Sequence, residues 1–267
     1  MFFPAFTHSG FMSADPLLID SPVPGILRLT LHRPNRCNAL SWELLLRLEE
    51  ILSLLPKREE KIVILRGAGK HFCSGLDLAQ AFAAGTDDTS LAYAMPEKVT
   101  QVLRTVLSIP QTVIAAVHGA AIGGGGALAA VCDYCVAGES TQIAFPELWH
   151  ALDSSLLYPF LRRRISPTSL KALHLRREGI DRAIASGLGL IHEYATEKDL
   201  DAAVLTRAKS LLDVEKTALV ELKKTANTDL IPSEEEIHAG LAAHWQSWKN
   251  QAVQEHIRAF LERSKRD

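Results

Sequence analysis

Two glycine-containing turns carry the residue types in this chain that most directly suggest chemistry. The first is Ser74-Gly75-Leu76-Asp77, and the second is the run of four glycines from Gly123 to Gly126. Each turn follows an apolar segment of strand length and precedes a helix-forming segment. Consecutive glycines cost backbone entropy, so either close backbone packing or a ligand must require them. Two such turns on adjacent strands can aim two backbone N–H groups at one carbonyl oxygen, which is the arrangement of an oxyanion hole.

The neighbours of the glycine run exclude two familiar loops. A phosphate-binding loop needs Lys followed by Ser or Thr after its last glycine, whereas Ala127 and Leu128 follow here. The dinucleotide fingerprint needs a glycine at the position of Leu128. Two interpretations stay open on the local sequence: a close-packed turn without a ligand, and backbone amides that face an oxyanion or a phosphate at a helix N-terminus.

Composition narrows the class of protein. The chain has 267 residues, 47% of them hydrophobic, and a formal net charge of -2. This length suits one large domain, and the near-neutral charge gives no electrostatic argument for nucleic acid as a partner. No uninterrupted apolar stretch reaches membrane-spanning length, so we expect no membrane partner. The four cysteines fit a reduced, cytoplasmic compartment, and the Cys132/Cys135 pair has neither a second pair nor a nearby histidine to indicate a metal site.

Hydrophobic patterns divide the chain into three parts: a flexible N-terminal extension over residues 1–14, an α/β core over 15–198 and a helical C-terminal subdomain over 199–267. The patterns predict strands at 25–31, 61–66, 113–117, 134–137, 142–145 and 189–193. They predict helices at 42–55, 96–107, 156–164, 168–176, 180–188, 199–213, 214–227 and 232–266, and a mobile loop or loose helix at 79–94. Strands alternating with helices, followed by helices alone, indicate an α/β fold with a helical appendage.

Several motifs together resemble the crotonase (enoyl-CoA hydratase/isomerase) superfamily over about residues 15–265. They are LHRPNRCNAL, HFCSGLDL, VIAAVHGAAIGGGG, CDYCVAGE, FPE and VQEHIRAFLER. The resemblance implies the ClpP/crotonase-like α/β fold, a superhelix of repeated ββα units with a helical C-terminal trimerisation region. It also implies a homotrimer or a dimer of trimers.

The resemblance assigns roles to individual residues. The amides of Leu76 and Gly124 match the two oxyanion donors that hold a thioester carbonyl in this family. Ser74, with Asp77 beside it, matches the segment that meets the adenine end of coenzyme A. The family's basic residue falls on Asn35, so Arg36 or Arg33 is the expected substitute for phosphate binding. The expected substrate-binding residues are Ser74, Asp77, Gly123, Ala127 and Arg36.

The acid/base residues of the family point to an altered mechanism. Its hydratases carry two glutamates; the first falls on Ala127 and is missing, while the second is Glu147, the expected catalytic residue. One carboxylate still suffices to move a proton next to a thioester carbonyl. The resemblance therefore implies hydration/dehydration or double-bond isomerisation by a single Glu. It implies no metal and no cofactor other than coenzyme A or phosphopantetheine as part of the substrate.

The segment from Glu147 to Leu175 narrows the alternatives further. It resembles the dehydratases of polyketide β-branching cassettes, which act on 3-hydroxy-3-methylglutaryl groups on acyl carrier protein. Alternatives that stay open are such a dehydratase, with acyl carrier protein as a partner, a Δ3,Δ2-enoyl-CoA isomerase and a non-catalytic crotonase-fold binding protein. Asp153 or Ser154 is a candidate for the acyl-pocket wall, and His150 is interpreted as a packing or solvated histidine.

Overall fold

A computed structural model describes residues 15–87 and 90–263 of the chain, so the predicted extension at 1–14 lies outside the described residues. The main sheet has the strand order β1-β2-β3-β4-β6-β9, in which β1 and β2 are antiparallel and the other pairs are parallel. A second sheet has the order β5-β7-β8. The strands are β1 (Leu17–Val23), β2 (Ile26–Leu31), β3 (Ile62–Gly67), β4 (Thr112–Val117), β5 (Ala120–Ile122), β6 (Tyr134–Ala137), β7 (Gln142–Ala144), β8 (Ile180–Asp181) and β9 (Glu193–Tyr194).

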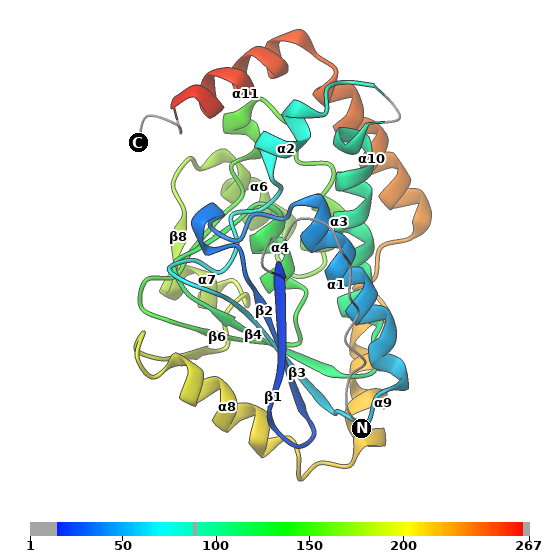
Figure 1. The fold of residues 1–267 in the computed structure, drawn as a ribbon, viewed down its shortest axis with the longest axis vertical. Coiled ribbons are helices and arrows are strands. Elements are labelled where there is room, and N and C mark those ends of the chain that lie inside the picture. The colour runs from blue at the N-terminus through cyan, green and yellow to red at the C-terminus, as the bar shows by residue number, and fades with distance from the viewer. Residues whose placement is uncertain (1–14, 88–89, 264–267) are drawn as a thin grey trace.

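Helices surround the main sheet and close one end of the molecule (Figure 1). The α-helices are α1 (Trp42–Leu54), α2 (Leu78–Ala83), α3 (Leu91–Ser108), α4 (Gly124–Ala130), α5 (Tyr158–Leu161), α6 (Pro167–Leu175), α7 (Arg182–Gly187), α8 (Leu200–Ser210), α9 (Lys216–Asn227), α10 (Glu234–Trp248) and α11 (Gln251–Arg263). The 3-10 helices are η1 (Pro34–Arg36), η2 (Leu55–Lys57) and η3 (Glu147–His150). No helix in the described residues is long and apolar enough to cross a membrane.

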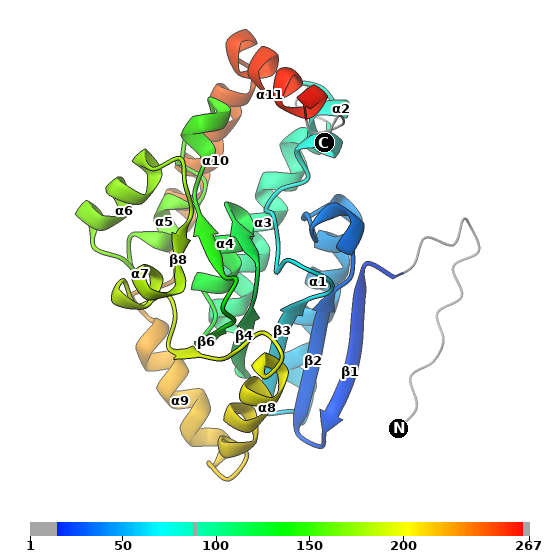
Figure 2. The ribbon, with the colours of Figure 1, turned by 90° about the vertical axis from the view of Figure 1, so that its left-hand side faces the viewer.

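The main sheet buries both of its faces. On β3, Val63 and Leu65 belong to the large core with residues of α1, α3 and α4, whereas Ile62 and Ile64 face a smaller core with residues of α8 and α9. Because successive side chains of a strand point to opposite faces, this division follows directly from the unbroken apolar run that predicted the strand. Figure 2 shows α8 and α9 at the end of the molecule opposite α11.

The second sheet brings two distant segments together at the candidate site. Strands β5 and β7 pair in parallel, with Ile122 opposite Ala144, and the Gly123 N–H donates to the Ala144 carbonyl at 2.8 Å. The chain that leaves β5 enters the glycine run, and the chain that leaves β7 enters η3 at Glu147. The parallel register therefore places the glycine run and Glu147 side by side.

The C-terminal helices differ from the prediction of one helix over 232–266. The helix ends at Trp248, and a second helix begins at Gln251. Asn250 provides the reason, because its side-chain Oδ1 accepts a hydrogen bond from the Ala252 N–H at 2.9 Å, as an N-cap residue does. The break turns the chain, so that α10 packs against α3 and α11 packs against α2 and η3 (Figures 1 and 2).

Three other predicted elements are shorter or shifted. The helix expected at 156–164 is reduced to α5, the segment 180–188 begins with the short strand β8 before α7, and the strand expected at 189–193 is β9, which begins only at Glu193. In the segment 79–94, where a mobile loop or a loose helix is expected, the described residues include α2 and the start of α3.

Candidate active site

The two glycine turns lie in direct contact. Just before the first turn, the Cys73 N–H donates to the Ala120 carbonyl at 3.0 Å, and the Cys73 carbonyl accepts from the Ile122 N–H at 2.9 Å. Gly75 has a φ of 86°, and a β-carbon added there would lie 2.7 Å from the Ile122 oxygen and 3.2 Å from the Gly124 nitrogen. Both the backbone conformation and the close approach therefore require glycine at position 75.

The two amides predicted as oxyanion donors have no hydrogen-bond partner within the described chain. Gly124 is the first residue of α4 after the N-cap Gly123, so its N–H belongs to the helix-terminal groups that have no intrahelical acceptor. The Leu40 N–H donates to the Gly75 carbonyl at 2.8 Å, and the Asp77 N–H donates to the Leu40 carbonyl at 3.1 Å. The Leu76 N–H, which lies between these two residues in the chain, is therefore directed away from Leu40. Leu76 and Gly124 line the same cavity, as an oxyanion hole requires.

The carboxylate of Glu147 lies against the second turn. A β-carbon added at Gly123 would be 3.0 Å from Glu147 Oε1, so the carboxylate occupies the space that this glycine leaves open. The other oxygen, Oε2, is buried and makes no hydrogen bond within the described residues. Glu147 lines the cavity together with Leu76 and Gly124. A buried carboxylate oxygen that accepts no hydrogen bond is costly in a folded protein, which makes Glu147 a candidate for a functional role.

A histidine that sequence analysis did not identify stands behind this carboxylate. His174 Nδ1, on α6, is 3.6 Å from Glu147 Oε2 and 3.0 Å from Ser154 Oγ. The His174 side chain is buried and its ring packs against Phe145, with the ring centroids 5.6 Å apart. These contacts restrict the positions available to Glu147 and make His174 a candidate positioning residue. No local signal in the segment 168–176 distinguishes this histidine from an ordinary core residue.

Three further ionisable side chains line the cavity with buried polar atoms that have no partner among the described residues: His150, Asp153 and His244. Burial lowers the pKa of His150, and the nearby His256 lowers it further. Burial also lowers the pKa of His244, against the opposing effect of Asp153 and Glu147. Sequence analysis proposed Asp153 for the pocket wall, where the structure places it. It interpreted His150 as a packing or solvated residue and missed His244, which reaches the cavity only because α10 folds back over it.

The other predicted site residues are more dispersed. Ser74 lines the cavity. Asp77 instead caps α2 by accepting from the Gln80 N–H at 3.1 Å and pairs with Arg33 at 2.9 Å. Arg36 is exposed and makes no ion pair within the described chain, so it remains available for a phosphate. Ala127 is completely buried one turn into α4 and is not part of the cavity lining in the described residues.

The Cys132/Cys135 pair does not form a reactive centre. Cys132 and Cys135 are buried, and burial raises the pKa of the Cys135 thiol to about 12 and that of Cys132 still further. Thiols in such surroundings are inert. Within residues 15–87 and 90–263, no group of three or more His, Cys, Asp or Glu side chains is arranged to hold a metal ion.

The fold and this site define a class of α/β proteins in which two backbone amides and one carboxylate face a common cavity, and comparison with known proteins identifies the family. The family model for enoyl-CoA hydratase/isomerase matches residues 23–267. A probable enoyl-CoA hydratase of Bacillus subtilis is 31% identical over 252 residues, which cover 89% of this chain and 92% of the relative. The peroxisomal Δ(3,5)-Δ(2,4)-dienoyl-CoA isomerase of Arabidopsis thaliana is 29% identical over 198 residues, which cover 70% of this chain and 71% of the relative.

Solved structures agree on the fold. A putative polyketide biosynthesis enoyl-CoA hydratase from Bacillus subtilis superposes with a TM-score of 0.82 at 19% identity, over 94% of this chain and 98% of that chain. At this identity the likeness concerns the fold alone. The chain belongs to the enoyl-CoA hydratase/isomerase family, with the crotonase fold, and is an enzyme of that family.

Proposed function

We propose that the protein moves a proton at the carbon next to the carbonyl of an acyl thioester, with Glu147 as the base. The carbonyl oxygen accepts hydrogen bonds from the N–H groups of Leu76 and Gly124. One observation carries this proposal: Glu147, whose Oε2 accepts no hydrogen bond within the described residues, lines one cavity with Leu76 and Gly124, whose N–H groups have no acceptor there. Charge that develops on the carbonyl oxygen as the proton leaves is stabilised by donors already in place.

The same first step leads to either reaction of the family. Glu147 takes the proton from the α-carbon, and the electron pair of the broken C–H bond moves into the enolate. For a double-bond shift, Glu147 returns the proton to the γ-carbon. For dehydration of a 3-hydroxyacyl thioester, the hydroxyl leaves the β-carbon and takes the proton from Glu147 as water. Relatives named as hydratases and as an isomerase are both consistent with this shared step.

The acyl carrier is proposed to be coenzyme A or the phosphopantetheine of an acyl carrier protein. The exposed Arg36 next to the first turn is the candidate for contact with a phosphate of either carrier. Because Arg33 is already paired with Asp77, it does not offer a second free cation at this place. The loss of the first glutamate at Ala127 was the feature in favour of a binding protein without activity, and the membership of the chain in an enzyme family speaks against that alternative.

Exchange of the α-proton for deuterium tests the proposal whatever acyl group the protein naturally accepts. Butyryl-CoA is incubated with the protein in deuterium oxide, and label at the α-carbon is followed by NMR. We expect exchange with the native protein and a loss of about 100- to 10,000-fold in Glu147→Gln, the usual contribution of a positioned base. Glu139→Gln, an exposed carboxylate that does not line the cavity, is the control. Equal exchange by Glu147→Gln and native protein, or none by either, contradicts the proposal.

A further inference from the structure

The cavity contains a second polar centre that the proposed proton transfer does not use. Asp153 Oδ1 accepts a hydrogen bond from the Ser155 N–H at 2.7 Å, whereas Asp153 Oδ2 is buried and has no partner in the described residues. His244 is only 5% exposed, and neither of its ring nitrogens has a partner among those residues. Both side chains line the cavity that holds Glu147 and the two free amides.

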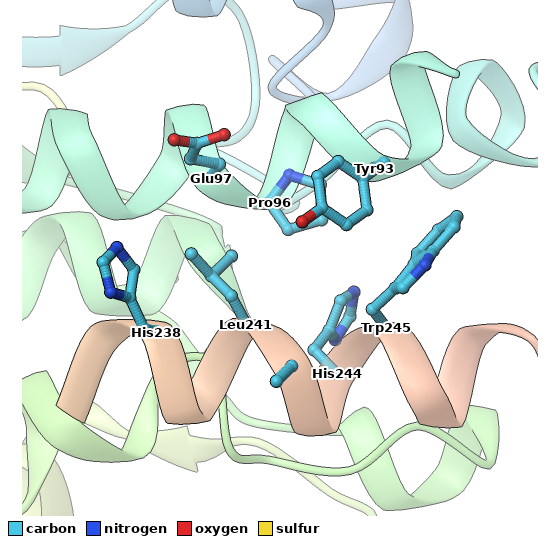
Figure 3. A pocket seen from close by; sticks show the side chains of 8 residues that line it. Tyr93, Pro96, Glu97, His238, Leu241, His244 and Trp245 are labelled. Atoms are coloured by element: carbon cyan, nitrogen blue, oxygen red, sulfur yellow. The ribbon is translucent and has the colours of Figure 1, made fainter. Parts of the chain in front are cut away.

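His244 lies where the active-site cavity meets a neighbouring groove. Figure 3 shows it on α10, pointing toward α3 between Leu241 and Trp245. It lines both the active-site cavity and the neighbouring groove between α3 and α10, and its ring stacks on Trp248 with centroids 6.4 Å apart. The helix backbone and this stacking fix the imidazole, so its two nitrogens are presented in fixed positions.

Buried polar groups without partners are rare because each one costs about 1–3 kcal/mol of folding free energy. Three such atoms on two side chains, lining one cavity, indicate that a bound molecule supplies the missing hydrogen bonds. We propose that Asp153 and His244 bind a hydroxyl group on the acyl part of the thioester. The proposal rests on the proposed function, because it assigns the acyl group to this cavity.

A hydroxyl group, which both donates and accepts, matches the donors and acceptors of the two side chains. Neutral imidazole offers one donor and one acceptor, and a carboxylate offers acceptors only. A hydroxyl donates to Asp153 Oδ2 and accepts from the His244 N–H, which satisfies both. An ammonium group has no acceptor for the imidazole N–H. A carboxylate has no donor for Asp153 and would be repelled by it.

Charge in the cavity argues against a carboxylate on the acyl group. Glu147 and Asp153 are the acidic residues of its lining, and no Lys or Arg of the described chain lines it. Burial lowers the pKa of His244 and so disfavours a positive charge on this imidazole. A free carboxylate on the acyl group, as in a 3-hydroxy-3-methylglutaryl group, would therefore enter a cavity without a cation to pair with it.

Pairs of thioesters that differ only by a methyl and a hydroxyl group test the inference. Binding is measured by calorimetry in the Glu147→Gln background, which prevents turnover. The pairs are pentanoyl-CoA with 4-hydroxybutyryl-CoA, and 3-methylbutyryl-CoA with 3-hydroxybutyryl-CoA; 4-aminobutyryl-CoA and succinyl-CoA represent the two charged classes. In at least one pair we expect the hydroxylated thioester to bind about 10- to 100-fold more tightly, since a site built for a hydroxyl rejects the analogue without it.

Variants then connect this preference to the two residues. Asp153→Asn keeps the shape but replaces the Oδ2 acceptor with a donor, and His244→Phe keeps the ring stacking and removes both nitrogens. Each should abolish the preference for hydroxyl while leaving binding of the methyl analogue within about threefold. His238→Phe is the matched control and should keep the preference, because this exposed histidine of the same helix lines the neighbouring groove but not the active-site cavity. Circular dichroism checks that each variant is folded.

The possible outcomes separate this inference from the proposed function. Equal binding within both pairs, tighter binding of the amino or succinyl thioester, or a preference that survives in folded Asp153→Asn and His244→Phe overturns the inference. If native protein still exchanges the α-proton of butyryl-CoA, the proposed function stands despite that result. If exchange is absent but the hydroxyl preference is present, the proposed function fails and the binding site stands.

Discussion

The Gly75→Ala substitution distinguishes the proposed oxyanion hole from ordinary backbone strain. Gly75 has a φ of 86°, and an added β-carbon would lie 2.7 Å from the Ile122 carbonyl oxygen, which is too close for any stable contact. The left-handed conformation costs roughly 1–2 kcal/mol for a residue with a β-carbon, and relief of the overlap costs about 1–3 kcal/mol more. We therefore expect the free energy of unfolding to fall by about 2–5 kcal/mol.

The effect on activity follows from the place of the overlap. The same added carbon lies 3.2 Å from the Gly124 nitrogen, so separation of the two turns displaces one proposed donor relative to the other. The loss of one such donor lowers a rate by roughly 100- to 1,000-fold. Gly85→Ala is the matched control: its φ is 85°, but an added carbon meets nothing within 4 Å. This control should lose only about 1–2 kcal/mol of stability and keep its activity.

Urea unfolding followed by circular dichroism measures the stability of both variants, and α-proton exchange with butyryl-CoA measures their activity. Exchange is compared at a temperature at which both variants are folded. The proposed oxyanion hole is refuted if folded Gly75→Ala exchanges the proton within about threefold of the native rate, or if Gly85→Ala loses as much activity as Gly75→Ala.

Three further predictions concern the groups behind the cavity and the buried charges. His174→Phe should lower kcat for exchange about 10-fold with little change in KM, because it removes the contact that positions Glu147; an equal change in both constants would contradict this role. Lys223→Met should lower the free energy of unfolding, measured in urea, by about 3–5 kcal/mol. The reason is that the buried Lys223 Nζ pairs with Asp133 Oδ2 at 2.7 Å and donates to two backbone carbonyls. A loss below about 1 kcal/mol would contradict this prediction. Burial lowers the pKa of three histidines, so below about pH 6.5 the unfolded chain binds more protons than the folded chain, and the free energy of unfolding should fall from pH 7.5 to pH 5.5. The three histidines are His150, His192 and His244. A free energy of unfolding at pH 5.5 that equals or exceeds the value at pH 7.5 would contradict this prediction.

The parts of the site that sequence analysis located are those fixed by local constraints. The glycines at 75 and 123 are required by backbone conformation, and such a requirement is visible in the residue type itself. The strands β3 and β4 that precede them each contain an unbroken apolar run, as buried parallel strands do. Glu147 was placed by family resemblance, and the parallel pairing of β5 with β7 explains why it reaches the glycine run.

The parts that were missed depend on contacts between distant elements. His174 and His244 lie on α6 and α10, and their positions at the cavity follow from how those helices fold back onto the core. The break at Asn250 was hidden because helical residues flank it on both sides, although its side chain is a good N-cap. Pro96 lies inside α3 rather than at its start, because earlier residues extend the helix toward its N-terminus.

The crystal structure of a complex with a non-reactive acyl-CoA analogue tests the central claim most directly. The account predicts that the thioester carbonyl oxygen lies about 2.7–3.1 Å from the nitrogens of both Leu76 and Gly124, with Glu147 Oε2 facing the α-carbon. A carbonyl oxygen bound elsewhere in the cavity, or an α-carbon facing away from Glu147, would contradict it.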